Sequence, residues 1–172
     1  MAAELKLLFS QQEIAETVTK LAREISADYA DKQLILIGVL KGAFVFLADL
    51  IRALTIPVEI EFIRIASYGA HKESSGEIKI KQDVEIVLEG KDVLVVEDIV
   101  DTGLSLTFLV DHLRRKNPSS LKVCALVDKR TRREIEAQVD YTGFVMDDGF
   151  IVGYGIDFNE EYRALPEIFV VS

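Results

Sequence analysis

Three uninterrupted apolar runs, separated by segments with helical periodicity, place the strongest constraint on the fold of this chain. The runs span residues 33–40, 93–96 and 121–127, and the segments between them span 43–54 and 102–116. Continuous apolar runs of this length are typical of strands that are buried on both faces of a parallel sheet. Strands that alternate with helices therefore predict an α/β fold with a mainly parallel central sheet flanked by helices. The length of 172 residues fits a single domain that spans the whole chain.

Further elements are predicted on either side of these runs. Residues 10–29 carry apolar side chains at helical spacing, and the Ser-Gln-Gln-Glu run at their start has the spacing of a capping box. Alternating apolar positions predict strands at 58–66 and 78–87, and a final strand is expected near 167–171.

Polar groups follow three of the predicted strands at the point where each strand ends. They are Lys41-Gly42, the run from Glu97 to Ser105, and residues 128–130. In parallel sheets, ligands bind outside the carboxyl ends of the strands. A single strand end that carries polar groups is usually an ordinary connecting turn, but three such strand ends at one edge of a sheet predict an active site.

The run 97–105 indicates the chemistry of the expected ligand. Its carboxylates Glu97, Asp98 and Asp101 suit a divalent cation or sugar hydroxyls. The hydroxyl and glycine residues that follow open a helix, whose free N–H groups suit a phosphate. The run therefore predicts a phosphorylated, hydroxyl-bearing, magnesium-associated ligand. Lys41-Gly42 is a candidate for a second anion site, although a plain connecting turn explains it equally well.

A polar stretch with two glycines, residues 67–77, separates two predicted strands. Loops of this length inside a compact domain more often have a function than serve only as connections. We predict that it is a lid, and a long solvated hairpin loop is the alternative.

Composition excludes several classes of protein. The net charge of −9 disfavours binding to nucleic acid or to an anionic membrane. The single cysteine, Cys124, lies in an apolar run and predicts a buried thiol, so a reducing, cytoplasmic location is favoured. We identify no signal peptide at the N-terminus and no apolar stretch long enough to span a membrane.

The run Val95-Val-Glu-Asp-Ile-Val-Asp-Thr-Gly-Leu-Ser105 resembles the phosphoribosyl pyrophosphate (PRPP) motif of the type I phosphoribosyltransferases. Leu104 departs from some members, which carry a basic residue there. The resemblance covers nearly the whole chain and implies the family's fold, with a small hood subdomain and a mobile loop. Segments similar to the pyrophosphate loop, the start of the mobile catalytic loop and the purine and pyrophosphate elements follow in the family's order, at 40–43, 67–68, 128–131, 150–154 and 157–163.

Within that family, the residues resemble the enzymes of purine salvage that act on 6-oxopurines. The resemblance implies that hypoxanthine, and guanine as well, reacts with PRPP to give IMP or GMP and pyrophosphate, with Mg²⁺ as cofactor. Charge would build on the ribose in an oxocarbenium-like transition state.

The resemblance also implies roles for the residues that hold PRPP. Glu97 and Asp98 would hold the ribose hydroxyls and magnesium, and Asp157 would bind a second magnesium through water. Asp101 would act as general base and take the proton from purine N7. The implied phosphate-binding positions are Lys41, Gly42 and Arg163 for the pyrophosphate, and Asp101, Thr102, Gly103, Leu104 and Ser105 for the 5′-phosphate.

On the purine side, Lys129 would donate to the 6-oxo group. Because lysine can only donate, this residue disfavours the 6-amino group of adenine. Phe150 would stack on the purine, and Ser67 and Tyr68 would close over the reaction and exclude water. The implied purine-binding positions are Ile99, Lys129, Phe150, Ile151 and Asp157.

Several alternatives stay open at this point. The preference between hypoxanthine and guanine is not decided, and an enzyme that prefers xanthine fits the same residues. A non-catalytic RNA-binding regulator on the same fold would need a basic face, which the acidic composition disfavours. Relatives form homodimers or homotetramers, and the predicted helix 43–54 is a candidate interface by analogy.

Overall fold

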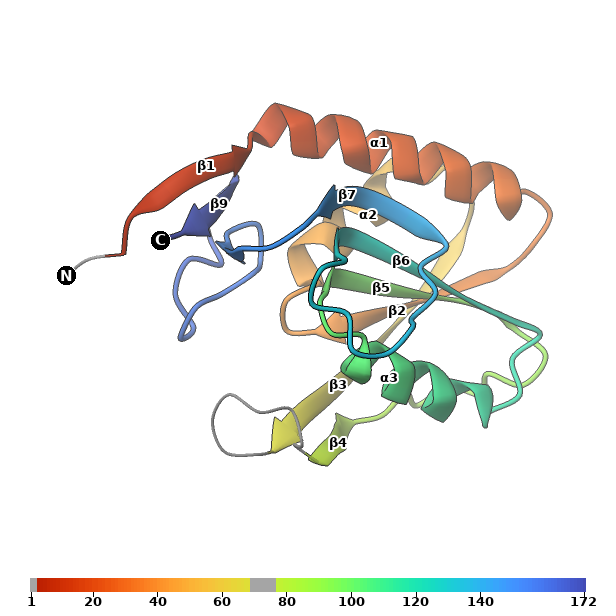
Figure 1. Ribbon diagram of the computed structural model, residues 1–172. Helices are drawn as coiled ribbons and strands as arrows, with labels where there is room; N and C mark the ends of the chain where they lie inside the picture. Colours follow the sequence, from red (N-terminus) through yellow and green to blue (C-terminus); the bar gives the residue numbers. More distant parts are fainter. Residues whose placement is uncertain (1–2, 69–76) are drawn as a thin grey trace.

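The computed structural model describes residues 3–68 and 77–172, and these form two β-sheets and three helices (Figure 1). The larger sheet has six strands in the order β4-β3-β2-β5-β6-β7. All neighbouring pairs in it are parallel except β3 and β4, which are antiparallel. Its strands are β2 (Leu34–Leu40), β3 (Val58–Tyr68), β4 (Glu77–Gln82), β5 (Asp92–Val100), β6 (Ser120–Lys129) and β7 (Tyr141–Met146).

The helices cover both faces of the larger sheet, so that the fold has three layers. Helices α1 (Gln11–Asp28) and α2 (Phe44–Ala53) lie on one face, and α3 (Leu104–Arg114) lies on the other (Figure 1). Successive residues of a strand point to opposite faces. Leu34 and Leu36 accordingly pack in the core with α1 and α2, whereas Ile35 and Ile37 pack in the core with α3. This double burial explains why the strand sequences are continuously apolar, and it confirms the predicted α/β architecture.

The start of α1 is fixed by the predicted capping box. The Glu13 N–H donates to Ser10 Oγ at 3.2 Å, and the Ser10 N–H donates to Glu13 Oε2 at 2.7 Å. Two donors that the first turn leaves unpaired are satisfied in this way. Among the described residues, no helix is both long and apolar enough to cross a membrane.

The strand expected at 78–87 is wrong in its second half. Strand β4 ends at Gln82, and the chain then continues in irregular structure up to β5. Asp83 breaks the strand because its carboxylate accepts a hydrogen bond from the Val84 N–H at 2.8 Å and contacts His112 of α3. Val84 and Leu88 then turn into the core below α3, so their apolar character reflects burial in a loop and not strand alternation.

A second, three-stranded antiparallel sheet joins the two ends of the described chain. Its order is β1-β9-β8, with β1 at Leu5–Phe9, β8 at Phe150–Val152 and β9 at Ile168–Val171. Leu5 of β1 lies opposite Val171 of β9. This small sheet lies beyond the carboxyl ends of the parallel strands and carries the loop 153–167 next to them (Figure 1). Strand β1 had no counterpart among the predicted elements.

Candidate active site

The sheet order brings the predicted polar strand ends together. Strands β2, β5 and β6 are adjacent and parallel, so Lys41, Glu97 to Ser105 and Lys129 lie at carboxyl ends along one edge of the sheet. The loop after β8 adds Asp157, Glu160 and Arg163 to this edge, because Lys41 Nζ lies 3.2 Å from Glu160 Oε2. The edge therefore combines carboxylates, cations and a helix N-terminus.

Gly42 lies directly against the carboxylate of Asp98. A Cβ atom added at Gly42 would lie 2.0 Å from Asp98 Oδ2 and 2.7 Å from its Cγ. Such distances are far below ordinary contact, so glycine is required for this approach. The peptide bond that precedes Lys41, between Leu40 and Lys41, is cis.

The adjacent carboxyls of Glu97 and Asp98 have raised pKa values. Burial raises the pKa of Glu97 well above its usual value, and the charge of Asp98 raises it further. Burial also raises the pKa of Asp98, against the opposing effects of a backbone hydrogen bond from Ile99 and the positive charge of Arg163. Two close carboxyls in a buried place are stabilised by a cation, so this pair fits a divalent metal ion.

The turn between β5 and α3 spans residues 101–103, and Leu104 and Ser105 open the helix. Gly103 has a φ of +88°, and a Cβ atom there would lie 2.6 Å from the carbonyl oxygen of Ile135. Helix α3 begins at this glycine; the Leu104 N–H donates to Thr102 Oγ1 at 3.3 Å, and helix geometry leaves the next N–H groups of the first turn for a ligand. A cavity of 240 Å³ opens beside this turn, and its lining includes Glu97, Asp101, Thr102, Gly103 and Ser105. An anion of the size of phosphate suits this position.

Asp101 and Lys129 form a pair between the β5 and β6 strand ends. Lys129 is buried, with 3% of its surface exposed, and its Nζ lies 3.5 Å from Asp101 Oδ2. Arg132 Nη1 also approaches that oxygen, at 3.4 Å. The other oxygen, Asp101 Oδ1, is buried and has no hydrogen-bond partner among the described residues. An acceptor without a partner at a cavity is placed to take a proton from a ligand.

Among the predicted purine-binding residues, Phe150 and Ile151 are the first two residues of β8, and Ile99 lies near the end of β5. The Phe150 ring is 49% exposed and meets the Phe158 ring edge-on, with 5.3 Å between centroids. Its neighbour Ile151 is buried, and Ile99 is partly buried against the same core. The exposed face of Phe150 can therefore stack on a planar ligand.

Lys41 and Arg163 are joined by Glu160. Arg163 Nη2 lies 3.2 Å from Glu160 Oε1 and 3.3 Å from Asp157 Oδ1, and its Nη1 donates to the Gly155 carbonyl oxygen at 2.8 Å. Hydrogen bonds from Arg163 and Lys41 lower the pKa of Glu160. Because these two cations approach one carboxylate from different segments, they can bind one anionic group together.

Ser67 and Tyr68 lie at the end of β3, where they pair with Ile78 and Glu77 of β4. Ser67 is exposed. Residues 69–76, which include most of the predicted lid, lie outside the described residues.

Sequence reasoning missed Arg133 and Glu160. Arg133 donates to the carbonyl oxygens of Asp101 and Lys129, both at 3.1 Å, and to the carboxylate of Asp128. It thereby ties the ends of β5 and β6 together below the Asp101–Lys129 pair. The cationic run at 129–133 contained a signal, but no sequence feature distinguishes Arg133 from the exposed cations beside it.

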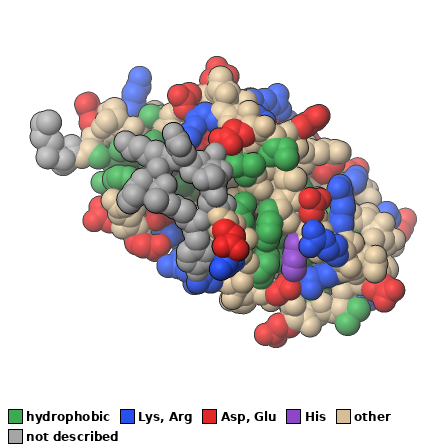
Figure 2. All heavy atoms as spheres, turned by 60° about the horizontal axis from the view of Figure 1, so that its bottom comes forward, with side chains coloured by type: hydrophobic (Ala, Val, Ile, Leu, Met, Phe, Trp, Pro, Cys, Tyr) green, Lys and Arg blue, Asp and Glu red, His purple; other side chains and the backbone are tan. Residues whose placement is uncertain are grey.

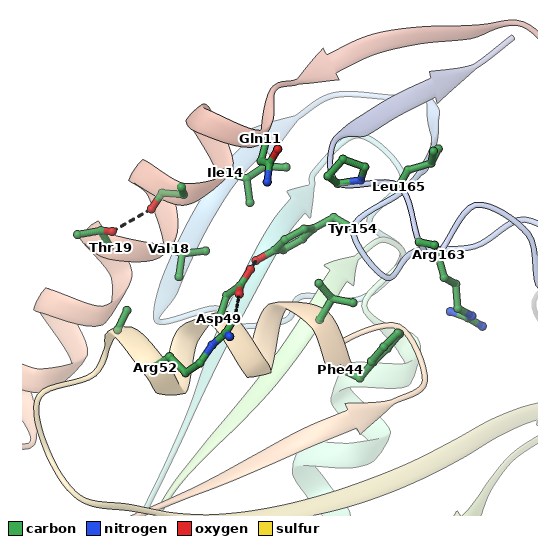
Figure 3. Close-up of a pocket in the computed structure, with 15 residues that line it drawn as sticks. Gln11, Ile14, Val18, Thr19, Phe44, Asp49, Arg52, Tyr154, Arg163 and Leu165 are labelled. Atoms are coloured by element: carbon green, nitrogen blue, oxygen red, sulfur yellow. Dashed lines mark hydrogen bonds and ion pairs between the residues drawn. The ribbon is translucent and has the colours of Figure 1, made fainter.

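A further hollow lies beside the candidate site, with Arg163 at its rim. It measures 780 Å³ and is lined by α1, α2 and the loop near Tyr154 (Figure 3). Tyr154 donates to Asp49 inside it, while the Arg163 guanidinium at its rim points away from both (Figure 3). In the described part of the chain, no three His, Cys, Asp or Glu side chains gather into a metal-binding group.

Comparisons with known proteins agree with this fold. The model of the phosphoribosyl transferase domain matches residues 5–159. The hypoxanthine-guanine phosphoribosyltransferase of Aquifex aeolicus is 45% identical over 169 residues, which cover 98% of this chain and 95% of that protein. The Bacillus subtilis enzyme of the same name is 43% identical over 167 residues, covering 97% and 93%.

Solved structures give the same result. A crystal structure of a hypoxanthine-guanine phosphoribosyltransferase from Bacillus anthracis superposes with a TM-score of 0.92 at 44% identity, covering 99% of this chain and 100% of that chain. A ternary substrate complex of a mutant hypoxanthine phosphoribosyltransferase from Trypanosoma cruzi gives 0.91 at 39% identity, covering 99% and 96%. The architecture is therefore that of a type I phosphoribosyltransferase. The chain belongs to the family of hypoxanthine-guanine phosphoribosyltransferases.

Proposed function

We propose that this chain catalyses purine salvage, in which hypoxanthine or guanine reacts with PRPP to give IMP or GMP and pyrophosphate. The observation that carries the proposal is the pair of Lys129 and Asp101. A buried ammonium group lies 3.5 Å from a carboxylate at the first residue of the phosphate-binding turn. A donor for the base and an acceptor for its proton are thus placed beside the anchor for the sugar phosphate.

Lys129 gives the site its preference for 6-oxopurines. Its ammonium group can only donate, so it pairs with an oxo group and leaves the 6-amino group of adenine without an acceptor. A buried donor left unpaired costs free energy, which is the usual source of strong discrimination between bases. Phe150 stacks on the purine face, while Ile99 and the Ile151 backbone complete the purine site.

Asp101 acts as general base in this proposal. Its Oδ1 accepts the proton from purine N7 while N9 attacks the anomeric carbon of the ribose. The turn from Thr102 to Ser105, including the Leu104 backbone, holds the 5′-phosphate and so fixes the ribose. Lys41, Gly42 and Arg163 receive the pyrophosphate group as the bond to the ribose breaks.

We further propose that Glu97 and Asp98 would hold the ribose hydroxyls of PRPP and the associated Mg²⁺, and that Asp157 would bind a second Mg²⁺ through water. Mg²⁺ is commonly held by one or two carboxylates with substrate phosphates and water, so a complete cage of protein ligands is not needed. When bound, it neutralises the leaving pyrophosphate. The raised pKa values of Glu97 and Asp98 support this assignment, because a cation would relieve their mutual repulsion. Ser67 and Tyr68 close over the reaction and exclude water.

Four assignments concern the protein as a whole. The chain acts as one phosphoribosyltransferase domain over residues 1–172, in the cytoplasm, and its substrates are small molecules. It assembles as a homodimer or homotetramer through α2, where Phe44 is 45% exposed beside the large hollow (Figure 3). A structural neighbour from Trypanosoma cruzi was solved to study how its C-terminal region affects oligomeric state, and the hollow here is lined in part by residues 163–166.

The test is a turnover panel with hypoxanthine, guanine, xanthine and adenine, each with Mg²⁺ and PRPP. We expect product from hypoxanthine and guanine and none from adenine. Asp101→Asn should reduce turnover by about 10²- to 10⁴-fold, the usual contribution of a general base, while PRPP binding is kept. Product from xanthine alone would point to a different base specificity, and no product from any base would favour a non-catalytic regulator.

A further inference from the structure

Glu160 occupies the position between two cations that the proposed reaction assigns to pyrophosphate. Its Oε2 lies 3.2 Å from Lys41 Nζ, and its Oε1 lies 3.2 Å from Arg163 Nη2. Each carboxylate oxygen therefore contacts a different cation, as two oxygens of a bound anion would. Lys41 and Arg163 belong to segments that are far apart in the sequence, so Glu160 is the link between them.

The backbone around Glu160 is built to hold this carboxylate in place. Asn159, Glu160 and Tyr162 have φ values of +52°, +65° and +74°, a region that residues other than glycine seldom adopt. The Glu160 N–H donates to Asp157 Oδ2 at 2.8 Å, and Phe158 and Glu161 exchange backbone hydrogen bonds across the turn. Unfavourable backbone conformations of this kind persist where the surrounding structure enforces them, and they gather at functional sites.

The contact leaves the cations incompletely satisfied. Arg163 Nε is buried and has no hydrogen-bond partner among the described residues. Glu160 is exposed, with 64% of its side chain accessible, so its ion pairs are screened by water. A ligand with more anionic oxygens than one carboxylate can displace Glu160 and also satisfy this remaining donor.

We propose that Glu160 is an internal competitor of pyrophosphate, and that it determines the affinity of this subsite. Its carboxylate neutralises Lys41 and Arg163 in the free protein, leaves when the pyrophosphate group of PRPP binds, and returns as the product pyrophosphate departs. The affinity for a ligand falls in proportion to the fraction of sites that are open to it. Glu160 therefore weakens the binding of pyrophosphate and favours its release. This inference rests on the proposed function, which supplies pyrophosphate as the ligand.

The test compares Glu160→Gln with Glu161→Gln in the full chain. Both variants remove one negative charge from the same exposed turn, but of these two glutamates only Glu160 forms ion pairs among the described residues. The measurement is calorimetric titration with inorganic pyrophosphate in the presence of Mg²⁺. Removal of two exposed ion pairs that compete with the ligand should change the dissociation constant for pyrophosphate by about three- to tenfold. We expect Glu160→Gln to bind pyrophosphate tighter by that factor, and Glu161→Gln to stay within about twofold of the wild type.

A gain in affinity cannot result from a partly unfolded variant, so this outcome is specific to competition. Equal or weaker binding by Glu160→Gln, an equal gain in Glu161→Gln, or no binding by any of the three proteins would overturn the inference. Turnover of the wild type is a separate readout. If no base gives product but Glu160→Gln still binds pyrophosphate more tightly, the proposed function fails and the competition stands. Where turnover is found, pyrophosphate should inhibit Glu160→Gln at correspondingly lower concentrations.

Discussion

Gly42→Ala is the most informative single substitution at this site, because the structure gives the size of the disturbance. The added Cβ would lie 2.0 Å from Asp98 Oδ2 and 2.7 Å from Asp98 Cγ. Rotation of the carboxylate about its last bond cannot remove the overlap, since Cγ itself is too close. Either the Asp98 side chain changes rotamer or the backbone at Gly42 retreats, by about 1 Å in each case. Gly42 does not have a positive φ, so alanine adds no strain of that kind.

A displacement of about 1 Å in a catalytic site can reduce the rate about 10²-fold, which corresponds to roughly 2.7 kcal/mol. We therefore expect kcat/KM for PRPP, measured with hypoxanthine, to fall by about 10² in Gly42→Ala, with little change in the melting temperature. Gly38→Ala is the matched control on the preceding strand. Its Cβ would lie 2.6 Å from Leu47 Cδ2 in the core, so it should lower the melting temperature but leave kcat/KM nearly unchanged.

A double-mutant cycle identifies the group that is displaced. If the overlap acts through Asp98, then Gly42→Ala should add less than about a threefold further loss in an Asp98→Ala background. A Gly42→Ala protein with activity within about threefold of the wild type would refute the reasoning, and so would an equal loss in both backgrounds.

Three further substitutions test other parts of the molecule. Lys129→Gln removes the charge of a buried donor, so the KM for hypoxanthine should rise about 10-fold or more while the KM for PRPP changes little. An equal rise of both KM values in steady-state assays would contradict the role of Lys129 as the donor to the purine. Arg133→Gln leaves the buried carboxylate of Asp128 with Arg130 as its remaining ion-pair partner. Urea unfolding should therefore show that the free energy of unfolding falls by about 3 kcal/mol. The control Arg130→Gln, which removes the exposed partner, should lower it by less than about 1 kcal/mol. Burial raises the pKa of Asp83, but hydrogen bonds from His112, the Val84 N–H and Lys116 outweigh it and leave the pKa lowered. This stabilisation is therefore present above the unfolded pKa and is lost as the pH falls through the folded pKa, so Asp83→Asn should cost about 0.5–1 kcal/mol near neutral pH and nothing in strong acid.

Asp83, His112 and Lys116 form a charged cluster on the surface. On the face seen in Figure 2, a histidine side chain lies among acidic and basic ones, and His112 and Lys116 of the described chain both contact Asp83. These contacts join the end of β4 to α3, the helix that begins at the proposed phosphate-binding turn. A measured pH dependence of stability would therefore report on the link between the two elements.

The central strands β2, β5 and β6 of the larger sheet could be predicted from the sequence because they are buried on both faces. Leu34 to Ile37 alternate between two cores, so every position must be apolar, and the sequence carries that requirement directly. The convergence of Lys41, Glu97 and Lys129 follows from the same rule, because parallel strands end at one edge. A local pattern was sufficient for these features.

Features that depend on contacts between distant segments could not be predicted in this way. Strand β1 pairs with β9 across almost the entire chain, and its residues have no clear alternation to indicate it. Glu160 contacts Lys41 only because the loop after β8 returns to the end of β2. The apolar residues after Gln82 had the pattern of a strand, but the Asp83 side chain ends the strand there.

The charges of the site explain how a chain with a net charge of −9 can bind a polyanionic substrate. Lys41 is paired with Glu160, Arg163 with Asp157, and Lys129 with Asp101. In the proposed reaction, PRPP and the purine would replace these carboxylates as partners of the cations, so the cations would stay paired throughout. This exchange would also release the carboxylates that had paired with the cations. A purine oxo group that accepts from Lys129 would release its contact with Asp101 Oδ2, which would leave Arg132 on that oxygen and Oδ1 as the acceptor for the proton.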